Sequence, residues 1–76
     1  MNLTNRARRV ERVKALHERA LLAIDGVQGV GVGEHEGRPA ITVFVVNRQL
    51  VGAKIPHELD RIPVYVEESG GAFQAL

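Results

Sequence analysis

The hydrophobic positions in the first third of the chain recur at steps of three and four residues. This spacing places the apolar side chains on one face of a helix, which we expect to run from Leu3 to Ile24, without internal glycine or proline. Thr4 or Asn5 can cap its N-terminus, and Gly26 suits the left-handed conformation that ends helices. The predicted core face comprises Val10, Val13, His17, Ala20, Leu21 and Ile24.

The next segment, residues 26–46, predicts a β-hairpin. Gly29 to Gly33 alternates strictly between glycine and valine, and a turn over residues 34–39 separates it from the apolar run Ala40 to Val46. Glycines inside a strand allow close approach by another group. We expect the N-terminal helix to cover the bare glycine face, with a ligand or a partner backbone as the functional alternative.

The second strand of this hairpin is apolar on both of its faces. Such a strand lies in the centre of a sheet or is covered by another subunit. A chain of 76 residues buries a modest core, so association is a natural way to hide more apolar surface. The predicted partner interface comprises Ile41, Val43, Phe44, Val45 and Val46.

The remaining pattern predicts a crossover over residues 47–61, a third strand over 62–68 and a tail over 69–76. Pro56 to Asp60 suits one helical turn, and the alternation in the third strand directs Tyr65 outward. The expected fold is a single α+β domain over residues 1–76. A long N-terminal helix, within residues 1–25, packs on a small three-stranded mixed sheet in the order α-β-β-short α-β. The third strand can run parallel to the second or pair antiparallel with the first.

Charge divides the chain into two parts. Residues 1–24 carry six basic and two acidic side chains, a net charge of +4, and the remainder carries four basic and seven acidic, a net charge of −3. This asymmetry indicates a basic helix facing an acidic sheet, or a basic surface for a partner. The chain has no cysteine, which excludes disulfides and thiolate metal sites.

Candidate chemistry is sparse. The run Gly29 to Gly33 begins like a phosphate-binding loop, but Glu34 stands where the third glycine belongs and a strand follows instead of a helix. His35 lies between two glutamates without a second histidine at ligand spacing. His17 suits a boundary position with one hydrogen bond, and Ser69, the single serine, has no base oriented toward it. We therefore expect no catalytic residue, metal or cofactor.

A series of glycine and aliphatic motifs runs through residues 26–76. In order, they are Gly26 to Gly33, Gly37 to Val45, Ile55 to Asp60, Ile62 to Val64, Glu68 to Gly70, Phe73 and Ala75-Leu76. Together they resemble a domain at the N-terminus of bacterial trypsin-like serine protease-related proteins. In those proteins a protease domain follows, whereas this sequence ends. The chain is therefore expected to be a stand-alone relative of the module or to stop at the domain boundary.

The resemblance implies an accessory module, because the catalytic serine, histidine and aspartate of a protease have no counterpart here. We predict a non-catalytic protein-interaction or assembly module that binds a protease-like chain or forms a homo-oligomer through its sheet or helix. The alternative is a small nucleic-acid-binding protein whose helix contacts phosphates through Arg6, Arg8, Arg9 and Arg12. No apolar run approaches the ~18 residues of a membrane span, so a cytoplasmic location without a membrane partner is expected.

Overall fold

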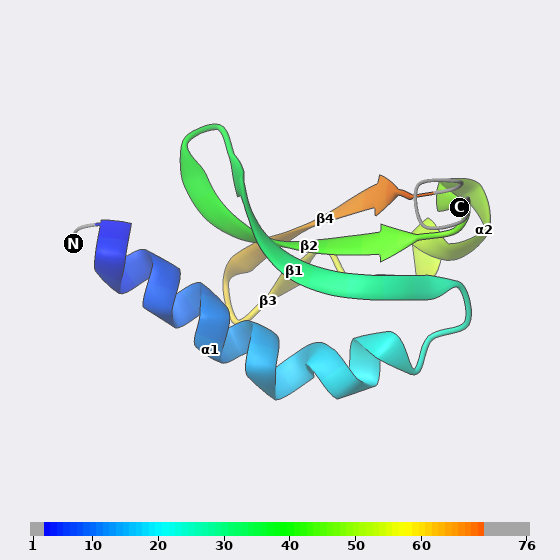
Figure 1. The fold of residues 1–76 in the computed structure, drawn as a ribbon, viewed down its shortest axis with the longest axis horizontal. Helices are drawn as coiled ribbons and strands as arrows, with labels where there is room; N and C mark the ends of the chain where they lie inside the picture. The colour runs from blue at the N-terminus through cyan, green and yellow to red at the C-terminus, as the bar shows by residue number, and fades with distance from the viewer. Residues whose placement is uncertain (1–2, 70–76) are drawn as a thin grey trace, which may run out of the picture.

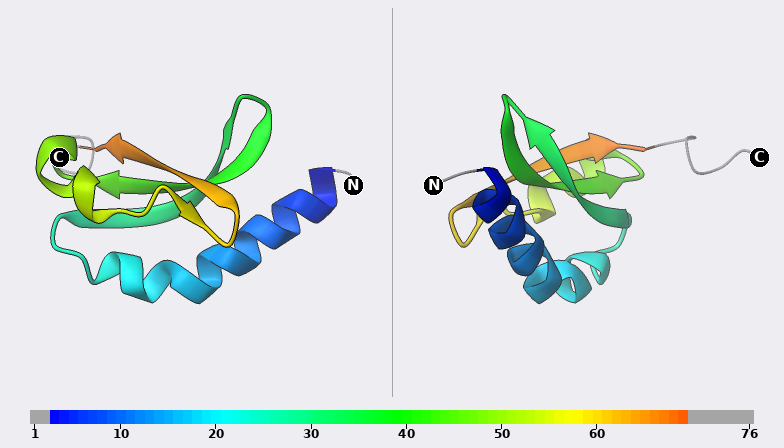
Figure 2. Two further views of the ribbon diagram at one scale, coloured as in Figure 1. Left: turned by 180° about the vertical axis from the view of Figure 1, so that it is seen from behind. Right: turned by 60° about the vertical axis from the view of Figure 1, so that its left-hand side comes forward.

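The computed structural model describes residues 3–69, which form one long helix packed on one face of a four-stranded sheet (Figures 1 and 2). The elements are α1 Leu3–Leu22, β1 Val27–His35, β2 Arg38–Val45, α2 Arg48–Val51, the 3-10 turn η1 Gly52–Lys54, β3 Glu58–Leu59 and β4 Ile62–Glu68. The strand order is β1-β2-β4-β3, with β2 and β4 parallel and the other pairs antiparallel. The α+β class is confirmed, and β3 adds a fourth strand. The predicted tail, apart from Ser69, lies outside the described residues.

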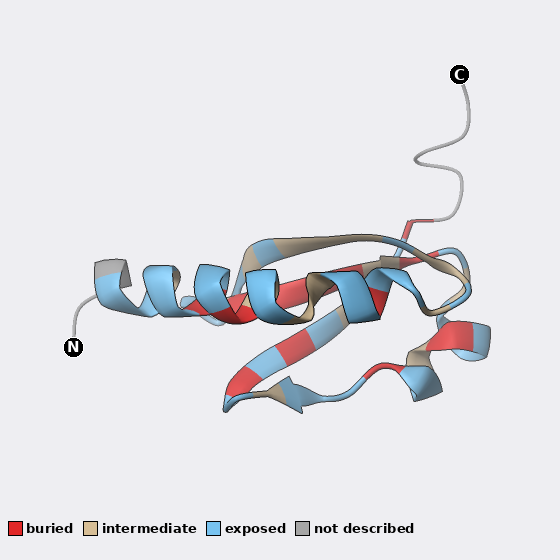
Figure 3. Ribbon diagram, turned by 90° about the horizontal axis from the view of Figure 1, so that it is seen from below, coloured by how far each residue is buried: buried red, intermediate tan, exposed pale blue. Residues whose placement is uncertain are grey.

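Helix α1 buries much of the face that its hydrophobic spacing predicts. Val10, Val13 and Leu21 are at most 5% exposed and belong to one core with the valines of β2. Exposed residues lie along the outer side of α1, as Figure 3 shows. Ala20 is exposed, contrary to its prediction. The helix already includes Leu3, which places the expected caps Thr4 and Asn5 inside its first turn, and it ends two residues earlier than expected.

The glycines of β1 face away from α1, so the expected helix packing on that face is wrong. In the antiparallel register Val30 pairs with Val43, on the core side, whereas Gly31 pairs with Thr42 on the opposite side. A Cβ atom at Gly31 would lie 3.7 Å from the ring of Phe44. The close approach that the glycines predict is real, but the approaching groups are side chains of β2.

The same outer face carries an aromatic pair. The tip of the β1–β2 hairpin lifts away from α1 (Figure 1), and the ring of His35 stacks on Tyr65 of β4 with 3.8 Å between centroids. Glu36 and Gly37 form the two-residue turn, both with positive φ. The turn is therefore shorter than predicted, because the strands continue to His35 and from Arg38.

The crossover between β2 and β4 differs from its prediction. Helical structure occupies residues 48–54, whereas residues 58–59 form the short strand β3, so the expected helical turn at Pro56 to Asp60 is wrong. Asp60 and Arg61 both have positive φ and join β3 to β4 in a two-residue turn. The signal for helix at residue 48 is Asn47, whose side-chain oxygen accepts from the backbone N–H groups of Gln49 and Leu50.

Replacing Asn47 with alanine should lower the free energy of unfolding by about 1 kcal/mol, because the two N–H groups at the start of α2 lose their acceptor. In a chain of this size, that change lowers Tm by about 4–8 °C. Thermal unfolding followed by circular dichroism measures the effect. Gln49→Ala is the matched control, since its side chain makes no hydrogen bond among those found for residues 3–69. Equal stability of Asn47→Ala and the wild type would contradict the capping role.

Candidate functional site

A hollow lined by four arginines lies where α1, the start of β2 and the β3–β4 turn meet. Its volume is about 360 Å³. We call it the arginine hollow, and its lining residues are Arg6, Arg9, Val10, Arg38, Pro39, Arg61, Ile62 and Pro63. The four guanidinium-bearing residues come from three separate segments of the chain, and no acidic residue lines the hollow. It is therefore a concentrated region of positive charge over an apolar lining.

The sheet topology brings two of these arginines together. The parallel register pairs Ile41 of β2 with Val64 of β4. Arg38 and Arg61 stand three positions earlier in the sequence than this pair, the first at the start of β2 and the second directly before β4, and therefore lie at the same end of the sheet. Arg6 and Arg9 reach this end from α1, which crosses the face of the sheet (Figure 1).

Contacts between α1 and the β3–β4 turn hold one side of the hollow in place. The guanidinium of Arg9 donates to the backbone carbonyl of Asp60 at 2.8 Å, and Nε2 of His17 lies 3.2 Å from the carboxylate of the same aspartate. His17 thus occupies a half-buried boundary position with one hydrogen bond, as predicted. Because Arg61 follows Asp60 directly, these two contacts also position Arg61.

Within residues 3–69, no salt bridge joins an arginine around the hollow to a carboxylate. The pairs found in this range are the ion pair of Lys14 with Glu18 at 3.1 Å and the hydrogen-bonded pair of His17 with Asp60 at 3.2 Å. Neither pair includes an arginine. Glu11 on α1 is exposed and takes part in neither pair. The positive charge at this end is consequently open to an external anion.

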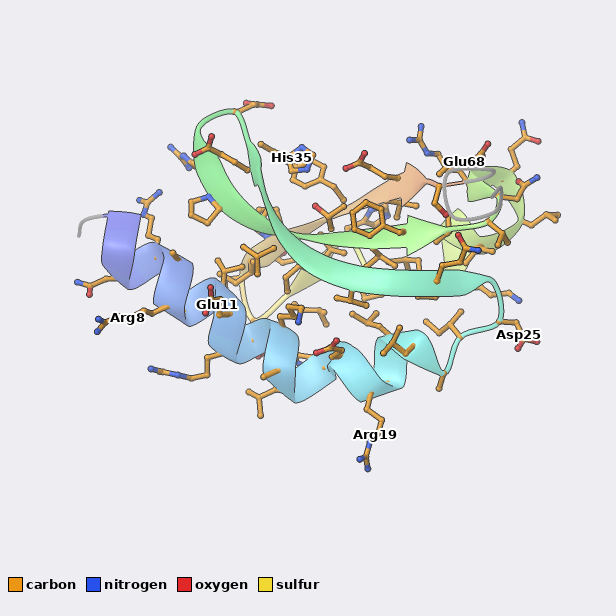
Figure 4. The ribbon with its side chains drawn as sticks, viewed as in Figure 1. Arg8, Glu11, Arg19, Asp25, His35 and Glu68 are labelled. Atoms are coloured by element: carbon orange, nitrogen blue, oxygen red, sulfur yellow. The ribbon has the colours of Figure 1, made fainter. Side chains whose placement is uncertain are left out.

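The basic surface extends beyond the hollow along α1. Arg8 and Arg12 line an adjoining depression together with Arg9 and one acidic residue, Asp60. We call the whole surface the arginine end, and it comprises Arg6, Arg8, Arg9, Arg12, Arg38 and Arg61. Figure 4 shows Arg8 at one end of the molecule, with Asp25 and Glu68 at the other. The separation of charge is partial, because Asp60 lies beside Arg9, Glu11 lies near Arg8 on α1, and Arg19 lies farther along the same helix.

All four arginines predicted to contact nucleic acid lie in the arginine end. The structure divides them, because Arg6 and Arg9 line the hollow whereas Arg8 and Arg12 lie beside it. Sequence reasoning missed Arg38 and Arg61. Each is a single arginine in a turn-like segment. The available signal is that Arg38 precedes Pro39 directly and Arg61 lies two residues before Pro63, at the starts of two strands that lie side by side.

The predicted partner interface has a different environment. Ile41, Val43 and Val45 are 0% exposed and form the centre of the chain's own core beneath α1. Phe44 is half-buried beside the glycines of β1, and Val46 is 41% exposed. The apolarity of this strand therefore follows from its central place in the sheet, one of the two explanations the sequence leaves open. A partner on this strand has access to Phe44 and Val46.

The sequence also raised Ser69 and the acidic and histidine side chains as candidates for catalysis or metal binding. The backbone N–H of buried Ser69 donates to the carbonyl of Val45 at 2.8 Å, and its hydroxyl contacts that carbonyl and the side-chain oxygen of Gln28. Neither partner is a general base. Across residues 3–69, no three side chains of histidine, aspartate or glutamate gather in a way that could hold a metal ion. In the same range, no helix is long and apolar enough to cross a membrane.

Comparison with protein-family models, curated proteins and solved structures finds no match for this chain. The resemblance to the protease-associated domain therefore stays a prediction.

Proposed function

We propose that the protein is a non-catalytic nucleic-acid-binding module that contacts phosphates through its arginine end. The observation that carries this proposal is the arginine hollow, where four arginines from α1, β2 and the β3–β4 turn surround one concave surface without an acidic lining residue. Arginine is suited to phosphate because its planar guanidinium presents paired donors to two phosphate oxygens.

The structure adds support that the helix sequence lacks. A basic helix alone is usually a solvated face, but here Arg38 and Arg61 join the helix arginines from elsewhere in the chain. Like charges gathered without carboxylate partners repel one another, and a bound polyanion relieves that repulsion. The overall charge of +1 does not oppose this, because the lining residues of the arginine hollow include four arginines and no acidic residue, and Asp60 lines only the adjoining depression.

Binding should depend strongly on salt. If all six arginines of the arginine end neutralise phosphates, the logarithm of the association constant for single strands falls against the logarithm of salt concentration with a slope of about −4. Fluorescence anisotropy with a labelled oligonucleotide, titrated between low and physiological salt, measures this slope. Arg8→Gln combined with Arg12→Gln should reduce its magnitude by about 1.4, since two phosphate contacts are lost.

Arg19→Gln combined with Lys54→Gln is the matched control. It removes the same charge from residues that lie outside both arginine-lined depressions. The control should leave the slope nearly unchanged. Absence of binding at low salt, or equal losses in the two double variants, would contradict the assignment of the arginine end.

A second candidate function, self-association through α1, has separate support. Leu16 is 70% exposed and Leu22 is 44% exposed on the outer side of the helix. Leu22 lines a shallow depression with Glu18 and Arg19, whereas Leu16 lines the depression that contains Arg8 and Arg12. Two antiparallel copies of α1 would place Glu18 and Arg19, which are unlike charges, opposite each other. We propose a second copy of this chain as the partner. Sedimentation equilibrium should show a dimer that Leu22→Lys disrupts, and a monomer at millimolar concentration would exclude it.

A further inference from the structure

We infer that the arginine hollow binds the terminal phosphate of a nucleic-acid strand, whereas the rest of the arginine end contacts internal phosphates. This inference rests on the proposed function and assigns a particular group to the hollow. Its starting point is a difference between two parts of one basic surface. Four arginines surround the hollow, while Arg8 and Arg12 lie outside it on the helix surface.

The charge in the hollow matches a terminal phosphate better than an internal one. A phosphomonoester carries a charge of about −1.5 to −2 at pH 7 and three strong acceptor oxygens. An internal phosphodiester carries one negative charge and is flanked by a sugar on each side. Four arginines from three directions supply more donors and more positive charge than one diester uses. A strand end can also enter a hollow without the chain continuing through it.

The lining between the arginines favours the same ligand. Val10, Pro39, Ile62 and Pro63 contribute apolar surface, and the two prolines carry no backbone N–H. The volume of about 360 Å³ lies at the lower end of the range for small-ligand sites, about 300–1,000 Å³. It therefore suits a phosphate with part of its nucleoside.

The backbone of the β3–β4 turn sets the position of Arg61. Asp60 and Arg61 adopt φ values of 50° and 69°, a conformation that residues other than glycine rarely take. The contacts from Arg9 and His17 to Asp60 maintain it. Arg61 lies in the lining of the hollow together with Arg6 and Arg9 of α1.

The test compares three oligonucleotides of one sequence with an internal fluorescent label. One carries a 5′-phosphate, one a 3′-phosphate and one no terminal phosphate. Anisotropy titrations of the full chain should show about tenfold tighter binding, or more, for at least one phosphorylated strand than for the strand without a terminal phosphate. The two phosphorylated strands identify which end the hollow takes.

Variants assign the preference to the hollow. Arg6→Gln combined with Arg61→Gln should abolish the preference for a terminal phosphate while binding through Arg8 and Arg12 persists. Arg8→Gln combined with Arg12→Gln should weaken binding of all three strands by the same factor and keep the preference. Arg6→Gln combined with Arg38→Gln provides a second hollow variant that leaves the β3–β4 turn unchanged, and thermal unfolding confirms that each variant is folded.

The outcomes separate this inference from the proposed function. Equal affinity for the three strands overturns the terminal-phosphate inference and leaves nucleic-acid binding intact. A preference that survives in both hollow variants also overturns it, because the phosphate is then recognised elsewhere. Failure of all three strands to bind at low salt overturns both proposals.

Discussion

Replacing Ile41 with alanine is expected to lower the free energy of unfolding by about 2–5 kcal/mol. Ile41 is 0% exposed and lies at the centre of the core between α1 and the sheet. A chain of 76 residues has a total stability of about 4–11 kcal/mol, so this single cavity removes a large share of it. Urea unfolding followed by circular dichroism measures the loss as a lower midpoint with an unchanged slope.

The same experiment separates a core strand from a partner interface. If the β2 side chains stabilise each chain internally, the loss in Ile41→Ala is independent of protein concentration. If they stabilise an oligomer, the midpoint rises with concentration because the unfolded chains are monomeric. Val46→Ala is the matched control, since Val46 belonged to the same predicted interface but is 41% exposed, and it should cost less than about 1 kcal/mol. A loss of similar size in both variants would contradict the core assignment.

Local patterns predicted the elements that depend on residues close in sequence. The three-and-four spacing located α1, and the alternation around Val64 located β4 with Tyr65 facing outward. The position of α1 relative to the sheet was harder to predict, because the bare glycine face and the valine face of β1 are both compatible with helix packing. The register with β2 decides between them: it directs Val30 to the core and Gly31 toward Phe44.

The short strand β3 illustrates another limit. Proline at position 56 followed by polar residues is typical of a first helical turn. The structure instead pairs Glu58 with Pro63 and Leu59 with Ile62 around the turn at Asp60-Arg61. Neither turn residue is glycine, and both have positive φ, so the usual sequence signal of such a turn is missing. Contacts from α1 to Asp60 compensate for it.

The candidate site shows the same division between local and long-range information. Arg6, Arg8, Arg9 and Arg12 are close in sequence, and helical spacing alone groups them. Arg38 and Arg61 join them through the parallel pairing of β2 with β4, which sequence reasoning left as one of two possibilities. Two of the four arginines in the hollow therefore depend on a strand pairing that local sequence patterns do not determine.

Replacing Gly26 with alanine should cost about 3 kcal/mol of unfolding free energy, for two separable reasons. Gly26 has a φ of +92°, where an alanine costs about 1–2 kcal/mol. An added Cβ atom would also overlap the Cγ2 atom of buried Val51, which adds an overpacking cost of about 1–3 kcal/mol. Gly37→Ala isolates the first term, because Gly37 has a φ of +78° but no atom within 4 Å of the added Cβ.

Chemical denaturation of the two glycine variants therefore measures the packing of Val51 against the connection between α1 and β1. Gly26→Ala should be the less stable variant by about 1–3 kcal/mol. Val51→Ala should itself destabilise the core, but adding it to Gly26→Ala should cost less than it does in the wild type, because it removes the overlapping methyl groups. Equal losses of stability in the two glycine variants would contradict this expectation. The backbone conformation alone would then account for the cost at residue 26, and contact with Val51 would add nothing to it.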